Sequence, residues 1–310
     1  MFRSFHPEVP LAKPSVAGWR SLRQTLGMPS RKPSASATVP TSRTLLVAVR
    51  SLWLATALLG ALSLSRAAAH TTAAPRTVVE IAWWLSVGAG FVALMVPGPT
   101  SLTVVRLVTP AMIPATALVW LGGAPATLAA IALAVATVTT IALLSAEAAE
   151  LLIQGGAYGD EQRLPLRTPA GVTVAAIIVW VVWCTVTLGA AAAVWHHSWL
   201  VAAALAVVSG GLKLLVLSRM QRLSNRWLVV VPAGLVVHDP LVLGETLMVQ
   251  RNNVRSVALA LEDTEAADLT GPAAGTAIEV VLHEMVTAVF PSSAAYPTGR
   301  AVHMASFLVS

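Results

Sequence analysis

The chain has 310 residues, of which 56% are hydrophobic and only 11% are charged. Its mean hydropathy is +0.75, whereas soluble globular domains usually carry about 25% charged residues. These values exclude an ordinary soluble domain and a chain that is disordered throughout. The single cysteine, Cys184, excludes a fold built on disulfides. The composition therefore predicts a multi-span membrane protein with polar ends.

The net charge of +6 is concentrated at one end of the chain. Residues 1–43 hold seven Lys or Arg residues against one acid, and residues 226–310 hold four Arg residues against eight acids. The first segment is also rich in Pro and Ser, so we expect a disordered basic tail. Attraction of this tail to anionic lipid explains its charge. Nucleic acid is therefore not an expected partner.

Six apolar segments are long enough to cross a bilayer, which takes about 20 helical residues for about 30 Å of hydrocarbon. Helices are expected because hydrocarbon offers no water to open backbone groups. Counts of five and seven spans stay open, because prolines interrupt the third segment and end the second. The segments form a predicted transmembrane domain over residues 44–225. They lie near residues 45–65, 79–97, 102–123, 125–145, 171–193 and 198–218.

The orientation follows from the Lys and Arg residues near the ends of these segments. With the N-terminus inside, thirteen lie on the inner face and only Arg66 and Arg76 on the outer face. This bias predicts a plasma-membrane protein with both termini in the cytoplasm. Arg50 and Lys213 lie inside spans near their inner ends, where long side chains reach the headgroups. Five tryptophans near the expected outer ends fit an aromatic belt: Trp83, Trp84, Trp120, Trp195 and Trp199.

Residues 226–310 have a different pattern, in which short β-rich runs alternate with turn clusters. Six or seven short strands in this length predict a small antiparallel sheet or barrel on the cytoplasmic side. An acidic loop is expected over residues 262–268. The expected strands cover residues 227–231, 235–238, 246–250, 254–261, 277–283, 286–290 and 302–307.

Two stretches of this domain resemble bacterial PH-like domains. Residues 226–237, RWLVVVPAGLVV, have a strand, a Gly turn and a second strand, and residues 248–257, MVQRNNVRSV, have a strand, a polar turn and a valine pattern. The whole chain resembles multi-span membrane proteins of high-GC actinobacteria. The resemblance implies a cytoplasmic domain without catalytic residues. Our candidate partner-binding residues are those of the polar turn: Arg251, Asn252, Asn253 and Arg255.

The third span carries the candidate residues for a substrate pathway. Arg106, Pro110 and Pro114 are spaced by four and share one helical face, and each proline frees a backbone carbonyl. Transporters build midplane sites from such broken helices. The alternative is a kinked packing helix whose arginine reaches the inner headgroups. Glu80, the only acid expected within a span, lies in the first turn of the second span, where it would complement the helix dipole.

No motif of catalysis or metal binding is present in the sequence. His196 and His197 are adjacent, so their side chains point apart, and no Cys, Asp or Glu near them completes a zinc set. The pair His283-Glu284 is followed by Thr287 where a zinc-protease helix needs histidine. The expectation is no enzyme activity, no metal and no cofactor.

Three functions follow in order of preference. The first is a non-enzymatic scaffold or regulator whose β-rich domain binds a protein partner or anionic lipid headgroups. The second is a transporter or channel component that uses Arg106, and the third is a membrane enzyme. The scaffold predicts dry packing around the third span, whereas a transporter predicts a polar cavity there. Small residues such as Ser86 and Gly90 serve packing within the chain as easily as a homo-oligomer.

Overall fold

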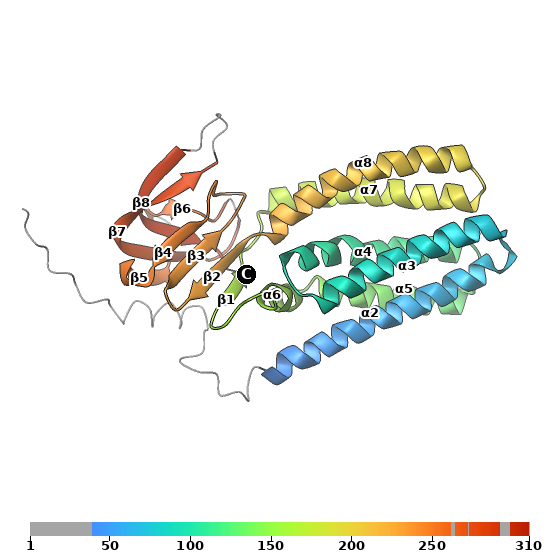
Figure 1. Cartoon of the computed structure of the whole chain (residues 1–310), viewed down its shortest axis with the longest axis horizontal. Helices are drawn as coiled ribbons and strands as arrows, with labels where there is room; N and C mark the ends of the chain where they lie inside the picture. Colours follow the sequence, from blue (N-terminus) through green and yellow to red (C-terminus); the bar gives the residue numbers. More distant parts are fainter. Residues whose placement is uncertain (1–38, 262–263, 272, 292–297, 310) are drawn as a thin grey trace, which may run out of the picture.

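The computed structural model describes residues 39–261, 264–271, 273–291 and 298–309. A bundle of helices is followed by a small β domain, as Figure 1 shows, which confirms the expected fold class. Within the described residues, six helices are long and apolar enough to cross a membrane, which indicates a multi-pass membrane protein. They are α2 (Val39–Ala67), α3 (Ala73–Met95), α4 (Pro99–Leu121), α5 (Ala126–Leu143), α7 (Ala170–Trp195) and α8 (Trp199–Ser224).

The first and last of these helices are longer than the sequence pattern suggests. Helix α2 begins at Val39, inside the segment expected to be a disordered tail, and residues 1–38 lie outside the described residues. Helix α8 continues to Ser224, beyond the expected end at 218. Arg222 in its last turn complements the negative end of the helix dipole. Helical structure therefore extends past the apolar window that hydropathy detects.

Helix α4 lies at the centre of the bundle and contacts every other helix of four turns or more, together with the short helix α6 (Ala146–Gln154). It stays helical through Pro110 and Pro114. Trp180 of α7 donates a hydrogen bond to the carbonyl of Leu107 at 3.0 Å, in the turn that Pro110 disrupts. Thr140 of α5 also donates to the carbonyl of Thr109, so side chains of two neighbouring helices bond to backbone carbonyls of α4 close to Pro110.

Helices α2 and α3 pack through two tryptophans that lie over glycines of the opposite helix. Trp53 of α2 covers Gly90 of α3, and Trp83 of α3 covers Gly60 of α2. Each indole nitrogen also donates to a backbone carbonyl across the interface, at 3.2 and 3.3 Å respectively. Trp83 is only 6% exposed and is therefore a packing residue, whereas Trp84, expected in the same belt, is 50% exposed.

Helix α6 is a separate element that follows α5 after a short break. The Ser145 hydroxyl accepts a hydrogen bond from the backbone nitrogen of Ala148 at 3.2 Å, which caps the new helix at its N-terminus. Glu147 and Glu150 are exposed, while the opposite face of α6 is buried against α2, α4 and α5. A short 3-10 turn, η1 (Ala68–His70), follows α2.

The β domain consists of two four-stranded sheets. The first has the order β1-β2-β3-β4 and is antiparallel throughout; the second has the order β5-β7-β8-β6, with β6 parallel to β8. The first sheet contains β1 (Gln162–Pro165), β2 (Trp227–Val231), β3 (Gly234–His238) and β4 (Leu247–Gln250). The second contains β5 (Val254–Leu259), β6 (Ala267–Asp268), β7 (Ile278–Phe290) and β8 (Thr298–Phe307), and the turn η2 (Arg251–Asn253) joins β4 to β5.

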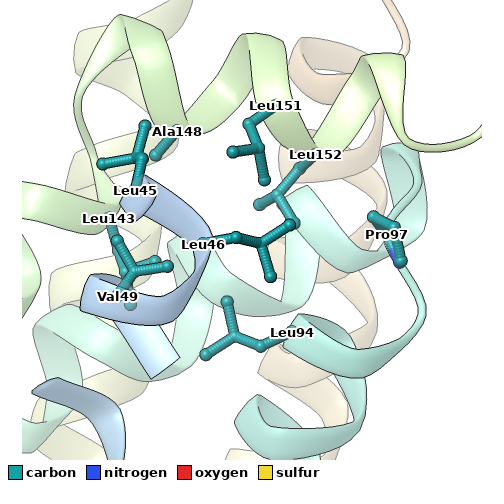
Figure 2. Close-up of a pocket in the computed structure, with 9 residues that line it drawn as sticks. All are labelled: Leu45, Leu46, Val49, Leu94, Pro97, Leu143, Ala148, Leu151 and Leu152. Atoms are coloured by element: carbon teal, nitrogen blue, oxygen red, sulfur yellow. The ribbon is translucent and has the colours of Figure 1, made fainter. Parts of the chain in front are cut away.

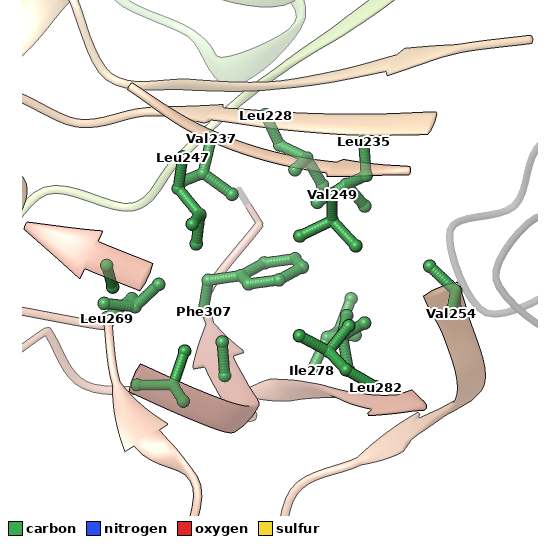
Figure 3. Close-up of a cluster of buried hydrophobic side chains, with 14 of the residues drawn as sticks. Leu228, Leu235, Val237, Leu247, Val249, Val254, Leu269, Ile278, Leu282 and Phe307 are labelled. Atoms are coloured by element: carbon green, nitrogen blue, oxygen red, sulfur yellow. The ribbon is translucent and has the colours of Figure 1, made fainter. Parts of the chain in front are cut away.

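Alternating apolar residues of both sheets form one core. Leu228, Leu235 and Val249 extend from the first sheet toward Phe307 and Ile278 of the second, as Figure 3 shows. Successive side chains of a strand point to opposite faces, so every second residue enters this core. Burial of each large apolar side chain contributes about 1.5–3 kcal/mol. In the sequence, these strands are recognisable as short β-rich runs bounded by turn clusters.

Strand β1 does not belong to the C-terminal segment, because it comes from the loop between α6 and α7. It pairs with β2, and Leu164 lies opposite Leu228. Leu166 then forms a bridge with Val309, after the end of β8. The loop between α6 and α7 thereby contacts both sheets, the first through β2 and the second through the residue that follows β8. Since β1 and β2 pair, the loop and the C-terminal domain lie on the same side of the bundle.

Candidate functional site at the junction of bundle and β domain

Arg226 is the centre of the junction between the helices and the β domain. It lies between the end of α8 and the start of β2, and its side chain is 1% exposed. Its Nε and Nη2 donate to the two carboxylate oxygens of Asp239 at 2.9 and 2.6 Å, a fork-to-fork ion pair. Nη1 donates to the carbonyl of Arg167 at 2.6 Å, and Nη2 also reaches that of Thr270 at 3.4 Å. One guanidinium therefore joins four chain segments.

The residues around the ion pair of Arg226 and Asp239 are closely packed. Asp239 Oδ1 also accepts from the backbone nitrogen of Leu241 at 3.0 Å. Gly271 has a φ of +55°, and a Cβ there would lie 2.5 Å from a methyl group of Val242. Both the left-handed backbone and the close contact require glycine. The junction is thus a tightly packed polar centre and not an open cleft.

An aromatic pair lies next to it. The ring of His238 stacks on Trp227 with centroids 4.7 Å apart, and His238 Nδ1 lies 3.0 Å from the Thr246 hydroxyl. Burial lowers the pKa of His238, and the nearby Asp239 carboxylate opposes this shift. Trp227 also packs against the apolar cluster of the helices. The junction therefore combines a buried ion pair with an aromatic contact to the bundle.

Arg106 lies at the same junction. Its Nη1 donates to the hydroxyl of Ser224, the last residue of α8, at 3.3 Å. Ser224 is buried, and the positive charge of Arg106 lies where the α8 dipole is negative. Pro110 and Pro114 follow one and two turns along α4 and are partly buried. The structure thus places Arg106 between α4 and the end of α8.

The structure does not bring Glu80 together with Arg106. Helix α3 begins at Ala73, so Glu80 lies two turns into it and not in the first turn, as expected from the sequence. Its carboxylate pairs with Arg76 at 2.9 Å, and both side chains are partly exposed. Glu80 is near the start of α3 and Arg106 near the start of the next helix, so the two residues lie at opposite ends of an antiparallel pair.

Arg50 caps a helix instead of only reaching toward headgroups. Its Nε and Nη2 donate to the carbonyl of Leu94 at 3.2 and 2.9 Å, in the last turn of α3. Carbonyls at a helix C-terminus lack a partner within the helix, and a positive side chain there is favourable. Lys213 is exposed on α8.

The candidate partner-binding turn divides into structural and exposed residues. The side chain of Asn253 donates to the carbonyl of Glu284 at 3.0 Å and accepts from its nitrogen at 2.6 Å. This pair holds the irregular part of β7, between Val281 and Val286. Arg251, Asn252 and Arg255 are exposed. Asn253 therefore shapes the turn, and the other three residues form its surface.

Metal-binding geometry is not found among the described residues, where no group of three His, Cys, Asp or Glu side chains comes together. His196 and His197 close the turn between α7 and α8, and His197 has a φ of +57°. Cys184 is buried in α7.

Sequence inspection missed Arg226 and Asp239 as a pair and β1 as a strand. From the sequence, Arg226 stands just before the strand expected over residues 227–231 and counts among the basic residues of the inner face, and Asp239 follows the strand expected over residues 235–238. One usable signal is present in the sequence. Arg226 and Asp239 each stand directly beside an apolar strand, and a charge buried there needs a partner of opposite charge.

Comparison of the chain with protein-family models, curated proteins and solved structures finds no match.

Proposed function

We propose that the protein is a non-enzymatic membrane scaffold or regulator that holds its β domain in a fixed orientation at the cytoplasmic membrane face and presents it to a protein partner. The double attachment of the domain carries this proposal. One connection is the α8–β2 link fixed by Arg226, and the other is β1, which continues into α7. A domain on one flexible linker samples many orientations, whereas two anchored connections restrict it.

The cytoplasmic orientation is supported by charge. Counted along the sequence, thirteen Lys or Arg residues belong to the segments expected on the inner side, which include the β domain, against two in the segments expected on the outer side. The positive-inside rule then favours a plasma-membrane protein whose β domain and N-terminus both face the cytoplasm. A partner of the domain would accordingly be a cytoplasmic protein.

The proposed binding surface is the corner around η2. Strand β5, which η2 precedes, lies at the end of the β domain away from the helices (Figure 1). Arg251 and Arg255 are exposed there, with Met248 and Met285 at 58% and 60% exposure on the adjoining strands. Arginine and methionine are enriched in protein interfaces, and methionine adapts to irregular partners. The position away from the bundle favours a protein over bilayer lipid.

Kinship with bacterial PH-like domains is part of the proposal. It is supported by residues 226–237, which contain the paired strands β2 and β3, and by residues 248–257, in which the turn η2 leads from β4 of the first sheet to β5 of the second. The chain differs from a single-segment domain because β1 is supplied by the loop between α6 and α7. The preference for 17 Arg over 3 Lys is compatible with a high-GC actinobacterial source.

The test compares intact proteins purified from their native membrane in mild detergent. Proteins retained by the wild type are quantified by mass spectrometry against Arg251→Glu/Arg255→Glu and against Arg300→Glu. The control makes one such charge reversal at an exposed arginine of the second sheet. We expect a partner that is lost only from the double variant, with melting temperatures of all three proteins alike. An identical set of retained proteins in all three preparations would refute the proposal.

Transport along α4 is the second candidate function, favoured by one observation. The indole nitrogen of Trp183 in α7 is buried without a hydrogen-bond partner, in a cluster that includes Leu107 of α4. A transported solute would accept a hydrogen bond from this nitrogen. This function predicts ion or solute flux in liposomes that Arg106→Ala abolishes, whereas the scaffold predicts that partner retention survives this substitution.

A further inference from the structure

Lys213 is a charged residue near the middle of helix α8. It lies 14 residues after the start of α8 at Trp199 and 11 residues before its end at Ser224. Its side chain is exposed, and within the part of the chain that the structure describes it has neither an ion pair nor a hydrogen bond. Because α8 is a candidate membrane span, this side chain faces the hydrocarbon of the bilayer, where an unpaired charge is costly.

The direction of α8 carries the lysine away from the nearer membrane surface. The Cα–Cβ bonds of a helix tilt toward its N-terminus, and α8 runs toward the β domain (Figure 1). The side chain of Lys213 therefore starts out toward the more distant surface of the membrane. Arg219, the next charged residue toward the β domain, lies about 9 Å farther along the helix axis. Lys213 is thus less well placed to reach the headgroups than its position in the sequence suggests.

The two arginines inside α2 and α4 differ from Lys213 in both respects. Helices α2 and α4 run away from the β domain, so the side chains of Arg50 and Arg106 start out toward the nearer surface. Each arginine also has a partner. Arg50 donates to the carbonyl of Leu94, whose side chain faces α2 in Figure 2, and Arg106 donates to the hydroxyl of Ser224. Lys213 has neither advantage, so the described residues leave its charge without compensation.

The surface around Lys213 is open to a neighbouring helix. Ala206 and Gly210 precede it by seven and three positions, which places them on the same face of α8, and both are exposed. A Cβ added at Gly210 would meet nothing within 4 Å. A second copy of this chain does not supply the missing counter-charge, because Glu80, the only acid in the described spans, pairs with Arg76 near the other end of the bundle.

We propose that this face of α8 binds a transmembrane helix of a partner protein that carries an Asp or Glu at the depth of Lys213. The ammonium and the carboxylate compensate each other where neither is hydrated, and Gly210 lets the backbone of the partner helix come close. The interaction lies within the membrane and uses none of the η2 residues, so it goes beyond the proposed function and does not depend on it.

The test uses the full-length protein in phosphatidylcholine liposomes, together with synthetic polyleucine helices that span the bilayer. One helix carries a single Asp at the depth of Lys213, a second carries the Asp within one turn of its end, and a third carries none. Energy transfer between labelled protein and labelled helix measures binding. Lys213→Leu removes the charge and Lys213→Arg keeps it. Arg219→Leu is the matched control, because Arg219 is exposed on the same helix nearer its end. Melting temperatures show that all variants fold.

We expect the wild type to bind the helix with the deep Asp about tenfold more tightly than the other two helices. Lys213→Leu abolishes this preference, whereas Lys213→Arg and Arg219→Leu keep it. Equal binding of the three helices by the wild type, or a preference that survives Lys213→Leu, overturns the proposal.

Two other occupants of this face are distinguished by the same liposomes. If phosphatidylglycerol added to the bilayer abolishes the preference for Asp, a lipid phosphate pairs with Lys213 and the proposal is wrong. Energy transfer between two labelled copies of the protein that Lys213→Leu abolishes would assign the face to a second copy and would likewise overturn the proposal.

Discussion

Gly60 and Gly90 each receive the indole ring of a tryptophan from the neighbouring helix. A Cβ added at Gly90 would lie 2.2 Å from Cζ2 of Trp53, and one at Gly60 would lie 2.0 Å from Cζ2 of Trp83. Such distances are far inside van der Waals contact, so one ring or one helix would have to move. The closeness of α2 and α3 therefore depends on the absence of a side chain at two positions.

Gly90→Ala should consequently destabilise the bundle by about 1–3 kcal/mol, the usual cost of overpacking. The matched control is Gly88→Ala on the same helix, where an added Cβ meets nothing within 4 Å. That change should be neutral or raise stability by up to about 1 kcal/mol, because alanine favours the helix. Thermal melting in detergent measures both variants. Equal melting temperatures for the two would contradict the proposed packing.

The ion pair of Arg226 with Asp239 provides the second prediction at this scale. Asp239→Asn leaves a buried guanidinium without its counter-charge, which costs about 3–5 kcal/mol. Replacement of both residues, as Arg226→Met/Asp239→Leu, removes the unpaired charge and should recover most of this loss. Denaturant unfolding of the intact protein in detergent distinguishes the two. A double variant that is less stable than Asp239→Asn would show that the pair itself, and not the relief of an unpaired charge, dominates.

Among whole elements, those with a strong local signal were predictable. The six spans follow from apolar length, and most strands of the core follow from short β-rich runs between turn clusters, as in residues 227–231. Strand β7 was expected as two strands because the polar pair His283-Glu284 interrupts the pattern. In the structure, Asn253 binds the backbone of Glu284 and carries one strand through this irregularity. A contact between residues 31 positions apart leaves no local trace.

Strand β1 is the element that local sequence could not identify. The residues Gln162–Pro165 are few, include Arg163 and end in proline, all of which disfavour a strand. Their partner, β2, lies more than 60 residues away. Proline is tolerated because it stands at the end of an edge strand. The candidate junction was missed for the same reason, since it exists only once this loop meets the C-terminal domain.

At the same scale, we predict that Leu166→Ala destabilises the β domain by about 2–5 kcal/mol, the range for truncation of a buried leucine. Leu166 is 4% exposed and belongs to the core of the β domain, although it lies in the loop between two spans. The control is Leu261→Ala, whose leucine is 79% exposed and whose removal should change stability by less than about 0.5 kcal/mol. Limited proteolysis within residues 226–310 reports the result. Equal digestion rates would mean that the loop is not part of the core.

Considered as a whole molecule, the chain has two parts that complete each other. The bundle supplies β1 to the β domain, and Arg226 donates hydrogen bonds to Arg167, in the loop before α7, and to Thr270, within the β domain. Arg106 adds a bond from the central helix to the end of α8. A displacement of α7 and α8 relative to α4 would therefore be transmitted to the β domain through rigid contacts. This connection is the physical basis of the proposed scaffold or regulator.

The pairing of β1 with β2 is the central claim, and disulfide cross-linking in native membranes tests it most directly. In a Cys184→Ser background, Arg163→Cys/Val229→Cys places thiols at directly paired positions, about 4.5–5.5 Å apart between Cα atoms. Arg163→Cys/Met248→Cys is the mismatched control, since β4 lies three strand spacings or about 14 Å away. Mild oxidation should link residues 163 and 229, as detected by mass spectrometry of the joined peptides, and should leave the control unlinked. A cross-link that forms only in the control, or in neither protein, would contradict the architecture on which the proposed function rests.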